Sequence, residues 1–121
     1  MPRFLRLLAP LSIALSINLL AFAGYGTVAY DQGARKQGFA WDEPTQERAN
    51  EAAWRDCGAE GCKVRFGVPP GKCAVLATPD SGPAWGGAVR KSVDEAKFAA
   101  IKNCQKHAKN KCIVRESKCI K

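Results

Sequence analysis

The sequence predicts an α+β fold of two related strand-helix-strand halves, with small antiparallel sheets and disulfide staples. Three observations support this prediction: the chain contains two similar segments, each has a short motif followed by an alanine-rich helix, and each contains three cysteines. Self-similarity of this kind indicates an internal duplication. The matching residues are Phe39-Ala40-Trp41, Ala49, Ala52, Ala53, Cys57, Cys62 and Cys73 in the first copy, and Pro83-Ala84-Trp85, Ala96, Ala99, Ala100, Cys104, Cys112 and Cys119 in the second.

Residues 1–23 have the composition of a secretory signal peptide. Arg3 and Arg6 give a basic start, an uncharged apolar stretch runs from Leu7 to Ala23, and Ala21-Phe22-Ala23 is a small-x-small cleavage site. An uncleaved signal anchor is the alternative. However, Pro10 and several polar residues interrupt the stretch, and a spanning helix needs ~20 strongly apolar residues. We therefore expect export, cleavage after residue 23, and no stable membrane span in the mature protein.

Residues 24–121 then form a single small domain with two pseudo-repeats, at about residues 26–78 and 84–119. A domain of this size buries only ~60 to 65% of its surface and often needs covalent staples. Its charge is uneven, because residues 24–89 carry 7 basic and 8 acidic side chains, whereas residues 90–121 carry 10 and 3. The second half therefore holds the whole positive excess.

The first repeat is expected to open with a β-hairpin followed by a helix. Residues 26–30 and 37–41 are β-prone runs on either side of a polar, glycine-containing loop, which is typical of a hairpin. Thr45 is a suitable N-cap for a helix that reaches about Asp56. Small side chains lie along one face of this helix and allow close packing on a sheet: Ala49, Ala53 and Cys57.

Two further strands are predicted after this helix. Residues 62–66 alternate between apolar and basic side chains, which is the period of a half-buried strand. Two prolines and a glycine in residues 68–72 predict a turn. Residues 73–78 are more uniformly apolar, so we expect a more fully buried strand there.

The second repeat follows the same plan. Residues 84–89 predict a weak strand, and Ser92-Val93-Asp94-Glu95 has the pattern of a capping box at the start of a helix that reaches about Lys106. Cys112-Ile113-Val114-Arg115 then matches Cys62-Lys63-Val64-Arg65. This match predicts a strand at the same place in both repeats.

Taken together, these motifs resemble a secreted bacterial family, that of domain of unknown function 4189. The resemblance covers nearly all of residues 24–121. It implies an exported, disulfide-linked α+β domain with two related halves, and it implies no activity. The second half is richer in lysine here, and its first two cysteines are further apart, so no charge-based function is carried over. The motifs are Thr27-Val28-Ala29-Tyr30, Phe39-Ala40-Trp41, the Ala-x-x-Ala-Ala helix ending in Cys57, Cys62-Lys63-Val64, Cys73-Ala74-Val75-Leu76-Ala77, Ala96 to Cys104, Cys112-Ile113-Val114 and Cys119.

The six cysteines are interpreted as three disulfides, as expected for an even number in an exported chain. Each bond stabilises the fold by ~2 to 4 kcal/mol. Neither copy contains a Cys-x-x-Cys pair and the chain has a single histidine, so we expect no zinc site, no redox centre and no cofactor. The symmetry of the copies favours Cys57 with Cys62, Cys104 with Cys112, and Cys73 with Cys119 across the halves. Exchange of partners within each copy is the main alternative.

No catalytic residues are predicted. His107 lies near the C-terminal end of the second helix, where the helix dipole favours a cation. A hydrolase would need a nucleophile and an orienting acid near it, and Ser92 already serves as a helix cap. Asp42 and Glu43 precede a helix, so they are interpreted as N-terminal charges rather than as a carboxylate pair for glycoside chemistry.

Trp41 and Trp85 occupy corresponding places in the repeated motif. Core filling at two equivalent sheet positions is the simpler interpretation. Interface aromatics are the alternative, since tryptophan is favoured at binding sites.

The lysines of the second half suggest a surface for an anionic partner, chiefly Lys102, Lys106, Lys109 and Lys111. A merely solvated face is the alternative. Nucleic acid is not favoured, because few aromatic residues are interleaved with the lysines and no known motif is present. We therefore expect a binding module, periplasmic or extracellular, that contacts an acidic protein or the anionic cell envelope. A secreted enzyme, or an inhibitor of one, with a cleft between the halves is the alternative.

Overall fold

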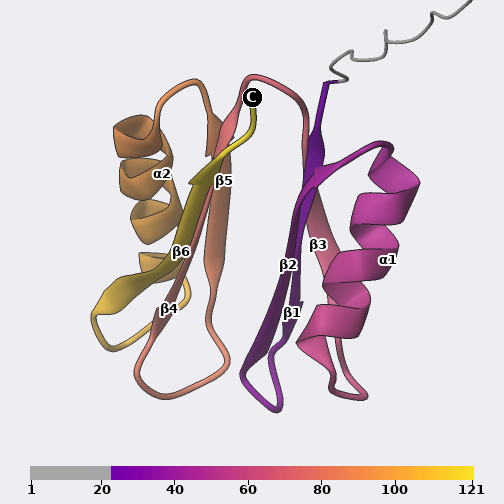
Figure 1. Ribbon diagram of the computed structural model, residues 1–121. Helices are drawn as coiled ribbons and strands as arrows, with labels where there is room; N and C mark the ends of the chain where they lie inside the picture. The colour runs from indigo at the N-terminus through magenta and orange to yellow at the C-terminus, as the bar shows by residue number, and fades with distance from the viewer. Residues whose placement is uncertain (1–22) are drawn as a thin grey trace, which may run out of the picture.

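The computed structural model describes residues 23–121. Within these residues two helices and six strands form four layers, with two sheets face to face and a helix on each outer side (Figure 1). The signal-peptide prediction falls almost wholly outside the described residues. The elements are β1 (Tyr25–Asp31), β2 (Lys36–Glu43), α1 (Gln46–Cys57), β3 (Lys63–Val68), β4 (Cys73–Pro79), β5 (Gly86–Arg90), α2 (Val93–Gln105) and β6 (Cys112–Cys119).

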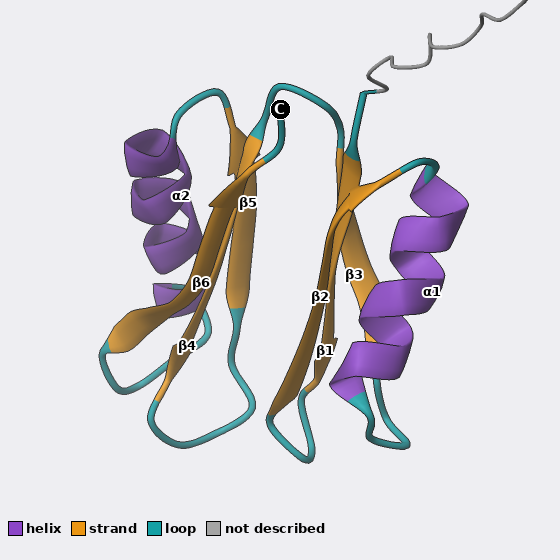
Figure 2. Ribbon diagram, viewed as in Figure 1, coloured by secondary structure: helices purple, strands orange, loops and turns teal. Residues whose placement is uncertain are grey.

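Each half of the chain builds its own three-stranded antiparallel sheet. The strand order is β2-β1-β3 in the first half and β5-β4-β6 in the second, so the strand that opens each half becomes its centre (Figure 2). A central strand covered on both faces is uniformly buried, and every residue of β4 and all but the first residue of β1 are buried. The predicted α+β fold with two related halves is confirmed.

The boundary between the repeats differs from the expectation. Residues 73–78 were expected to end the first repeat, yet β4 forms its hydrogen bonds with β5 and β6. The repeats are therefore 25–68 and 73–119 rather than 26–78 and 84–119, and β4 is the counterpart of β1. Cys73 therefore belongs to the second half and not to the first, because strand pairing in space, and not the number of cysteines in each copy, determines which sheet a strand joins.

Both helices begin and pack as predicted. The Thr45 hydroxyl accepts a hydrogen bond from the Arg48 N–H at 3.1 Å, and the Ser92 hydroxyl accepts one from the Glu95 N–H at 3.2 Å. A left-handed Gly58 (φ 64°) ends α1, a conformation that glycine adopts without strain. Small residues at equivalent positions face the sheets and are buried: Ala49, Ala53 and Cys57 in α1, and Ala96, Ala100 and Cys104 in α2.

A glycine in each hairpin lets the helix touch its sheet. A Cβ atom at Gly38 would overlap the Ala53 carbonyl oxygen and the Cys57 backbone. A Cβ atom at Gly86 would overlap the Ala100 carbonyl oxygen and the Cys104 backbone in the same way. Gly38 and Gly86 are therefore equivalent positions, and each is needed for close helix-sheet contact.

This equivalence corrects the predicted alignment of the tryptophans. Counting from the two glycines, Trp41 in β2 corresponds to Val89 in β5, and Trp85 precedes Gly86 outside the strand. The two tryptophans are thus not at equivalent sheet positions. The Ala-Trp dipeptide occurs in both copies at different registers, and only the packing of the helices reveals the shift.

The two sheets enclose a shared hydrophobic core. Val28 and Tyr30 of the first half and Leu76 of the second form one buried cluster, and Val68, Ala74 and Ile120 form another. Aromatic side chains surround these clusters, and both tryptophans are among them: Phe39, Trp41, Phe66 and Trp85. Because both clusters draw residues from both halves, the halves fold against each other as one unit.

The three disulfides join Cys57 with Cys62, Cys104 with Cys112, and Cys73 with Cys119. These are the pairs that the symmetry of the copies favoured. The third bond does not cross the halves as expected, because Cys73 and Cys119 are directly opposed residues on β4 and β6 of the same sheet. All six cysteines are paired within one half or the other, so the halves are held together by packing and hydrogen bonds.

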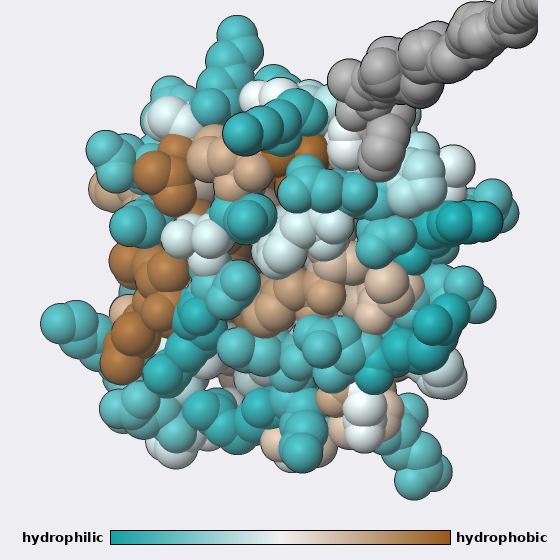
Figure 3. Space-filling view, in the orientation of Figure 1, coloured by the Kyte–Doolittle hydropathy of each residue, from teal (hydrophilic) through white to brown (hydrophobic). Residues whose placement is uncertain are grey.

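Within residues 23–121 no helix is long and apolar enough to cross a membrane. The face formed by β2 and β6 is largely hydrophilic, and hydrophobic surface gathers on its α2 side (Figure 3).

Candidate functional site

A groove of about 730 Å³ runs along β5, an edge strand of the second sheet. The strand forms the floor, the end of α2 forms one wall, and first-half residues contribute to the other. The groove therefore lies where the two halves and a helix meet. Its lining residues are Gln32, Phe66, Pro83, Ala84, Trp85, Gly86, Gly87, Ala88, Val89, Arg90, Asn103, Lys106 and His107.

Alternate backbone groups of β5 point away from its partner β4. The Asn103 side-chain amide donates to the Gly87 carbonyl at 2.9 Å, and the Arg90 guanidinium donates to the Val89 carbonyl at 2.9 Å. In an antiparallel pair, the N–H and C=O of one residue point to the same side. The N–H groups of Gly87 and Val89 therefore face outward, and within residues 23–121 no hydrogen-bond acceptor contacts either of them.

The corresponding edge strand of the first half, β2, has different hydrogen-bond partners and side chains. Asp56, one residue before the helix cysteine just as Asn103 is, accepts a hydrogen bond from the Phe39 N–H at 2.9 Å. Phe39 occupies the place of Gly87 in the strand, and its ring stacks on Trp41 with centroids 5.8 Å apart. The groove beside β5 thus lies where the second half has a glycine in place of an aromatic residue.

Aromatic groups from both halves meet at the groove. The Phe66 ring lies so close to Gly87 that a Cβ atom there would overlap it, and the ring stacks on Trp85 with centroids 6.5 Å apart. The Arg65 guanidinium carbon sits 5.2 Å from the Trp85 ring centroid, within cation-π range. Trp85 therefore packs against the core and also lines the groove, whereas Trp41 packs against the core and does not line the groove.

The predicted lysine surface is divided by the fold. Lys106 lines the groove, and a smaller neighbouring hollow shares Arg90, Asn103 and Lys106 with it and adds Lys102. Phe98, 72% exposed, also lines that hollow. Lys109 and Lys111 lie in the α2–β6 loop outside both linings, flanking Asn110, whose side chain donates to the Ser81 hydroxyl at 3.0 Å.

His107 lines the groove, but no catalytic partner for it does. Among the groove-lining residues there is no serine, cysteine, aspartate or glutamate. Among residues 23–121 no group of three or more histidine, cysteine, aspartate or glutamate side chains could hold a metal ion. The groove therefore offers hydrogen-bond donors, apolar surface and positive charge, and its lining sets no carboxylate, serine hydroxyl or thiol beside His107.

A second polar cluster lies where the β1–β2 hairpin meets the β4–β5 loop. Arg65 and Arg115 are the extra residues at the β-bulges of β3 and β6, and their guanidinium Nε atoms donate to the Tyr30 carbonyl at 3.1 Å and to the Thr78 hydroxyl at 2.8 Å. Tyr30 and Thr78 are themselves equivalent residues of the two central strands. Neither arginine was predicted as a site residue, although the repeated Cys-x-Val-Arg motif marks both positions.

Residues 25–119 match the family described as Domain of unknown function (DUF4189). No curated protein and no solved structure matches the chain. The match spans both repeats and all six cysteines. The chain therefore belongs to the family defined by this domain of unknown function.

Proposed function

We propose that the protein is an exported, non-catalytic binding module that holds an extended, acidic segment of a partner protein in the groove beside β5. The observation that supports this proposal most directly is the groove itself, which follows an edge strand over its full length and has a basic rim. An extended segment fits an edge strand because its backbone can continue the hydrogen-bond ladder.

The backbone of β5 supports this mode of binding. The outward N–H groups of Gly87 and Val89 are donors without an acceptor, and open strand edges pair readily with another extended chain. Asn103 and Arg90 already bond to the two outward carbonyls, so an incoming strand would chiefly accept hydrogen bonds. Trp85 and Phe66 offer apolar surface for its side chains.

The charge of the rim favours an acidic occupant. Arg90, Lys102 and Lys106 gather around the groove and the adjoining hollow, where Glu95 is the one acidic residue of the two linings. Charge complementarity speeds association and excludes basic partners. The anionic envelope is the other partner class that the lysines suggest, but a flat lipid surface would not use the groove.

Export is part of the proposal. Three disulfides occur in the chain, and such bonds persist in oxidising compartments. The composition of residues 1–23 supports a cleaved signal peptide. The intact mass of protein recovered from the periplasm or medium tests this: we expect a chain starting at Gly24 and six hydrogens below the mass of the all-thiol form. A full-length mass with free thiols would contradict export.

The groove proposal is tested with a fluorescent, extended peptide of alternating glutamate and valine as the probe. Reversing two rim charges in Lys102→Glu/Lys106→Glu should weaken its binding at least about tenfold, equivalent to about 1.4 kcal/mol. Raising the salt concentration should weaken binding to the wild type. The matched control is Lys109→Glu/Lys111→Glu, which changes the net charge equally outside the groove.

A second variant separates strand addition from charge attraction. Val89→Pro removes one outward N–H, and an edge strand tolerates proline where that N–H faces solvent. We expect weaker peptide binding with unchanged salt dependence. If both double-charge variants weaken binding equally, or if Val89→Pro binds like the wild type, the groove is not the site. Binding to anionic lipid vesicles, but not to the peptide, would favour the envelope instead.

The enzyme alternative has one observation in its favour, since His107 lines a cleft between the halves. If the protein turns over a substrate, His107→Ala should abolish the activity, because His107 is the only general base at this cleft. Peptide binding should survive that substitution.

A further inference from the structure

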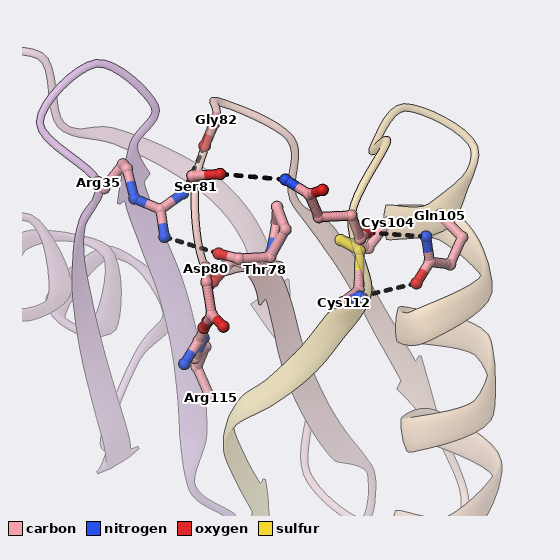
Figure 4. Close-up of polar contacts among 11 residues, drawn as sticks. Arg35, Thr78, Asp80, Ser81, Gly82, Cys104, Gln105, Cys112 and Arg115 are labelled. Atoms are coloured by element: carbon pink, nitrogen blue, oxygen red, sulfur yellow. Dashed lines mark hydrogen bonds and ion pairs between the residues drawn. A yellow bond between two sulfur atoms is a disulfide. The ribbon is translucent and has the colours of Figure 1, made fainter.

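A pocket of about 360 Å³ opens beside Tyr30, at the end of the layer between the sheets. It is separate from the groove, because the two share no lining residue. Figure 4 shows Arg35 of the first half and Arg115 of the second approaching the end of β4 and the loop that follows it. The pocket is lined by Tyr30, Arg35, Gln37, Thr78, Asp80 and Arg115.

Tyr30 is a buried polar side chain without a partner. It is 1% exposed, and within residues 23–121 no hydrogen bond involves its hydroxyl group. Buried polar groups in native proteins are nearly always hydrogen-bonded to protein, water or ligand. An unpaired tyrosine hydroxyl at a pocket therefore indicates that something else fills this place.

The two arginines are held in position by the protein. Arg115 donates through Nε to the Thr78 hydroxyl at 2.8 Å and through Nη2 to the Asp80 carboxylate at 3.0 Å. Arg35 donates to the Pro79 carbonyl at 2.6 Å and to the Gly82 carbonyl. Each guanidinium group has further N–H donors that these bonds do not use. Both groups are therefore held in place and can still donate to a ligand.

Donors outnumber acceptors in this pocket. Tyr30, Gln37 and the remaining N–H groups of the arginines can donate, whereas Asp80 is already paired and its side chain is 82% exposed. Positive charge dominates as well, because two arginines, Arg35 and Arg115, line the pocket against one carboxylate, that of Asp80. Asp31 is bonded to the backbone N–H groups of Gly33, Ala34 and Gly61.

Burial raises the pKa of Tyr30 above its ordinary value, although the neighbouring arginines act in the opposite direction. The phenol therefore keeps its proton at neutral pH and acts as a donor. A protonated hydroxyl beside fixed guanidinium groups matches the oxygen atoms of an anion.

We propose that this pocket binds a small oxyanion, of the phosphate, sulfate or carboxylate class, between the Tyr30 hydroxyl and the Arg115 guanidinium, with Gln37 and Arg35 beside it. The site joins the two halves, since Tyr30, Arg35 and Gln37 come from the first and Thr78, Asp80 and Arg115 from the second. An occupied site would add a polar link to halves that no disulfide connects.

The test titrates the full mature chain with inorganic phosphate and, separately, with acetate, against chloride at equal ionic strength. Calorimetry should show one saturable site, and the thermal midpoint should rise with ligand occupancy. Tyr30→Phe should weaken anion binding at least about tenfold while leaving the midpoint in chloride unchanged or raised, because it removes an unpaired buried hydroxyl. Arg115→Gln should weaken binding at least as much.

Lys118→Gln is the matched control, since it removes one positive charge outside the pocket and should bind like the wild type. The relative affinities for phosphate and acetate distinguish a tetrahedral from a planar anion. No saturable site in the wild type, or equal affinity in Tyr30→Phe, would overturn the proposal. Should Arg115→Gln fail to fold, Tyr30→Phe alone decides. Peptide capture in the β5 groove does not depend on this result.

Discussion

The two halves share a fold, yet they differ sharply along one edge strand. Both have the glycine under the helix, the helix-to-strand disulfide and the arginine at the bulge. In the edge strand β2, two of the positions are Phe39 and Trp41, which stack on each other. In β5 the same positions are Gly87 and Val89, and a groove with a basic rim lies beside them.

This difference separates what the fold requires from what a binding site can use. The shared residues are buried or fix the backbone, so changing them in either half should damage the structure equally. The differing residues surround the groove, so changing them should affect binding more than stability. The following predictions compare one half with the other on this basis.

The largest difference should concern the disulfide that only the second half has. Cys73 and Cys119 are 46 residues apart, whereas Cys57 and Cys62 are 5 apart. A disulfide that closes a longer loop restricts the unfolded chain more. Replacing Cys73 and Cys119 with alanine should therefore lower the free energy of unfolding by about 4 kcal/mol, and replacing Cys57 and Cys62 by about 2 kcal/mol. Urea denaturation of both variants measures the two values. Equal losses would mean that loop length does not govern these bonds.

The glycines under the helices should be equally intolerant. Gly38→Ala and Gly86→Ala each place a methyl group against helix backbone that cannot move aside, so each should cost about 3 kcal/mol. Gly87→Ala is the comparison, because the atom in its way belongs to the movable Phe66 ring, and the loss should be smaller. If Gly86→Ala lowered the free energy of unfolding only slightly, α2 would not be in close contact with its sheet at this position.

Tyr30 should give the first half a pH dependence that its counterpart Thr78 cannot give the second. Because burial raises the folded-state pKa, the unfolded phenol ionises first as the pH exceeds about 10. Its contribution is therefore complete below that pH and is lost as the pH rises through the folded-state pKa. Tyr30→Phe should lose stability less steeply than wild type as the pH rises above about 10. If the free energy of unfolding fell with pH in the same way in wild type and Tyr30→Phe, the burial of this hydroxyl would be contradicted.

The smallest effects should come from the two ion pairs found within residues 23–121, one in each half. Glu51–Arg55 is exposed on α1, and Asp80–Arg115 has one exposed partner. Such pairs contribute about 0 to 1 kcal/mol, so Glu51→Gln and Asp80→Asn should shift the unfolding midpoint by no more than about 5 °C. Thermal unfolding at low and high salt measures both. A large loss in Asp80→Asn alone would indicate that this contact holds the loop after β4 against β6.

Much of the fold could be predicted because its signals are local. Thr45 and Ser92 mark the helix starts through hydrogen bonds made three residues away. The alanine spacing identifies the buried helix faces, and the cysteine symmetry gives the disulfide pairs that the structure contains. Each of these features depends on neighbours along the chain or on the duplication, and both can be read from the residue order.

The candidate sites were only partly predictable. Lys102 and Lys106 were named, but nothing in the sequence separates them from Lys109 and Lys111, because the helix end and the following loop divide the set in space. Tyr30 and Arg115 are 85 positions apart in the sequence, and only the packing of one sheet on the other brings them to one pocket.

The sequence by itself determined the α+β class, the duplication and the helix caps, and it favoured the cysteine pairs without excluding an exchange of partners. Tertiary structure alone decided that β4 belongs to the second sheet, that Trp41 and Trp85 are not equivalent, and that a groove follows β5. The physical reason is that strand pairing and sheet-on-sheet packing are contacts between distant residues. A local pattern predicts that a strand will form. Which strand pairs with it, and which sheet covers it, depends on contacts across the whole fold.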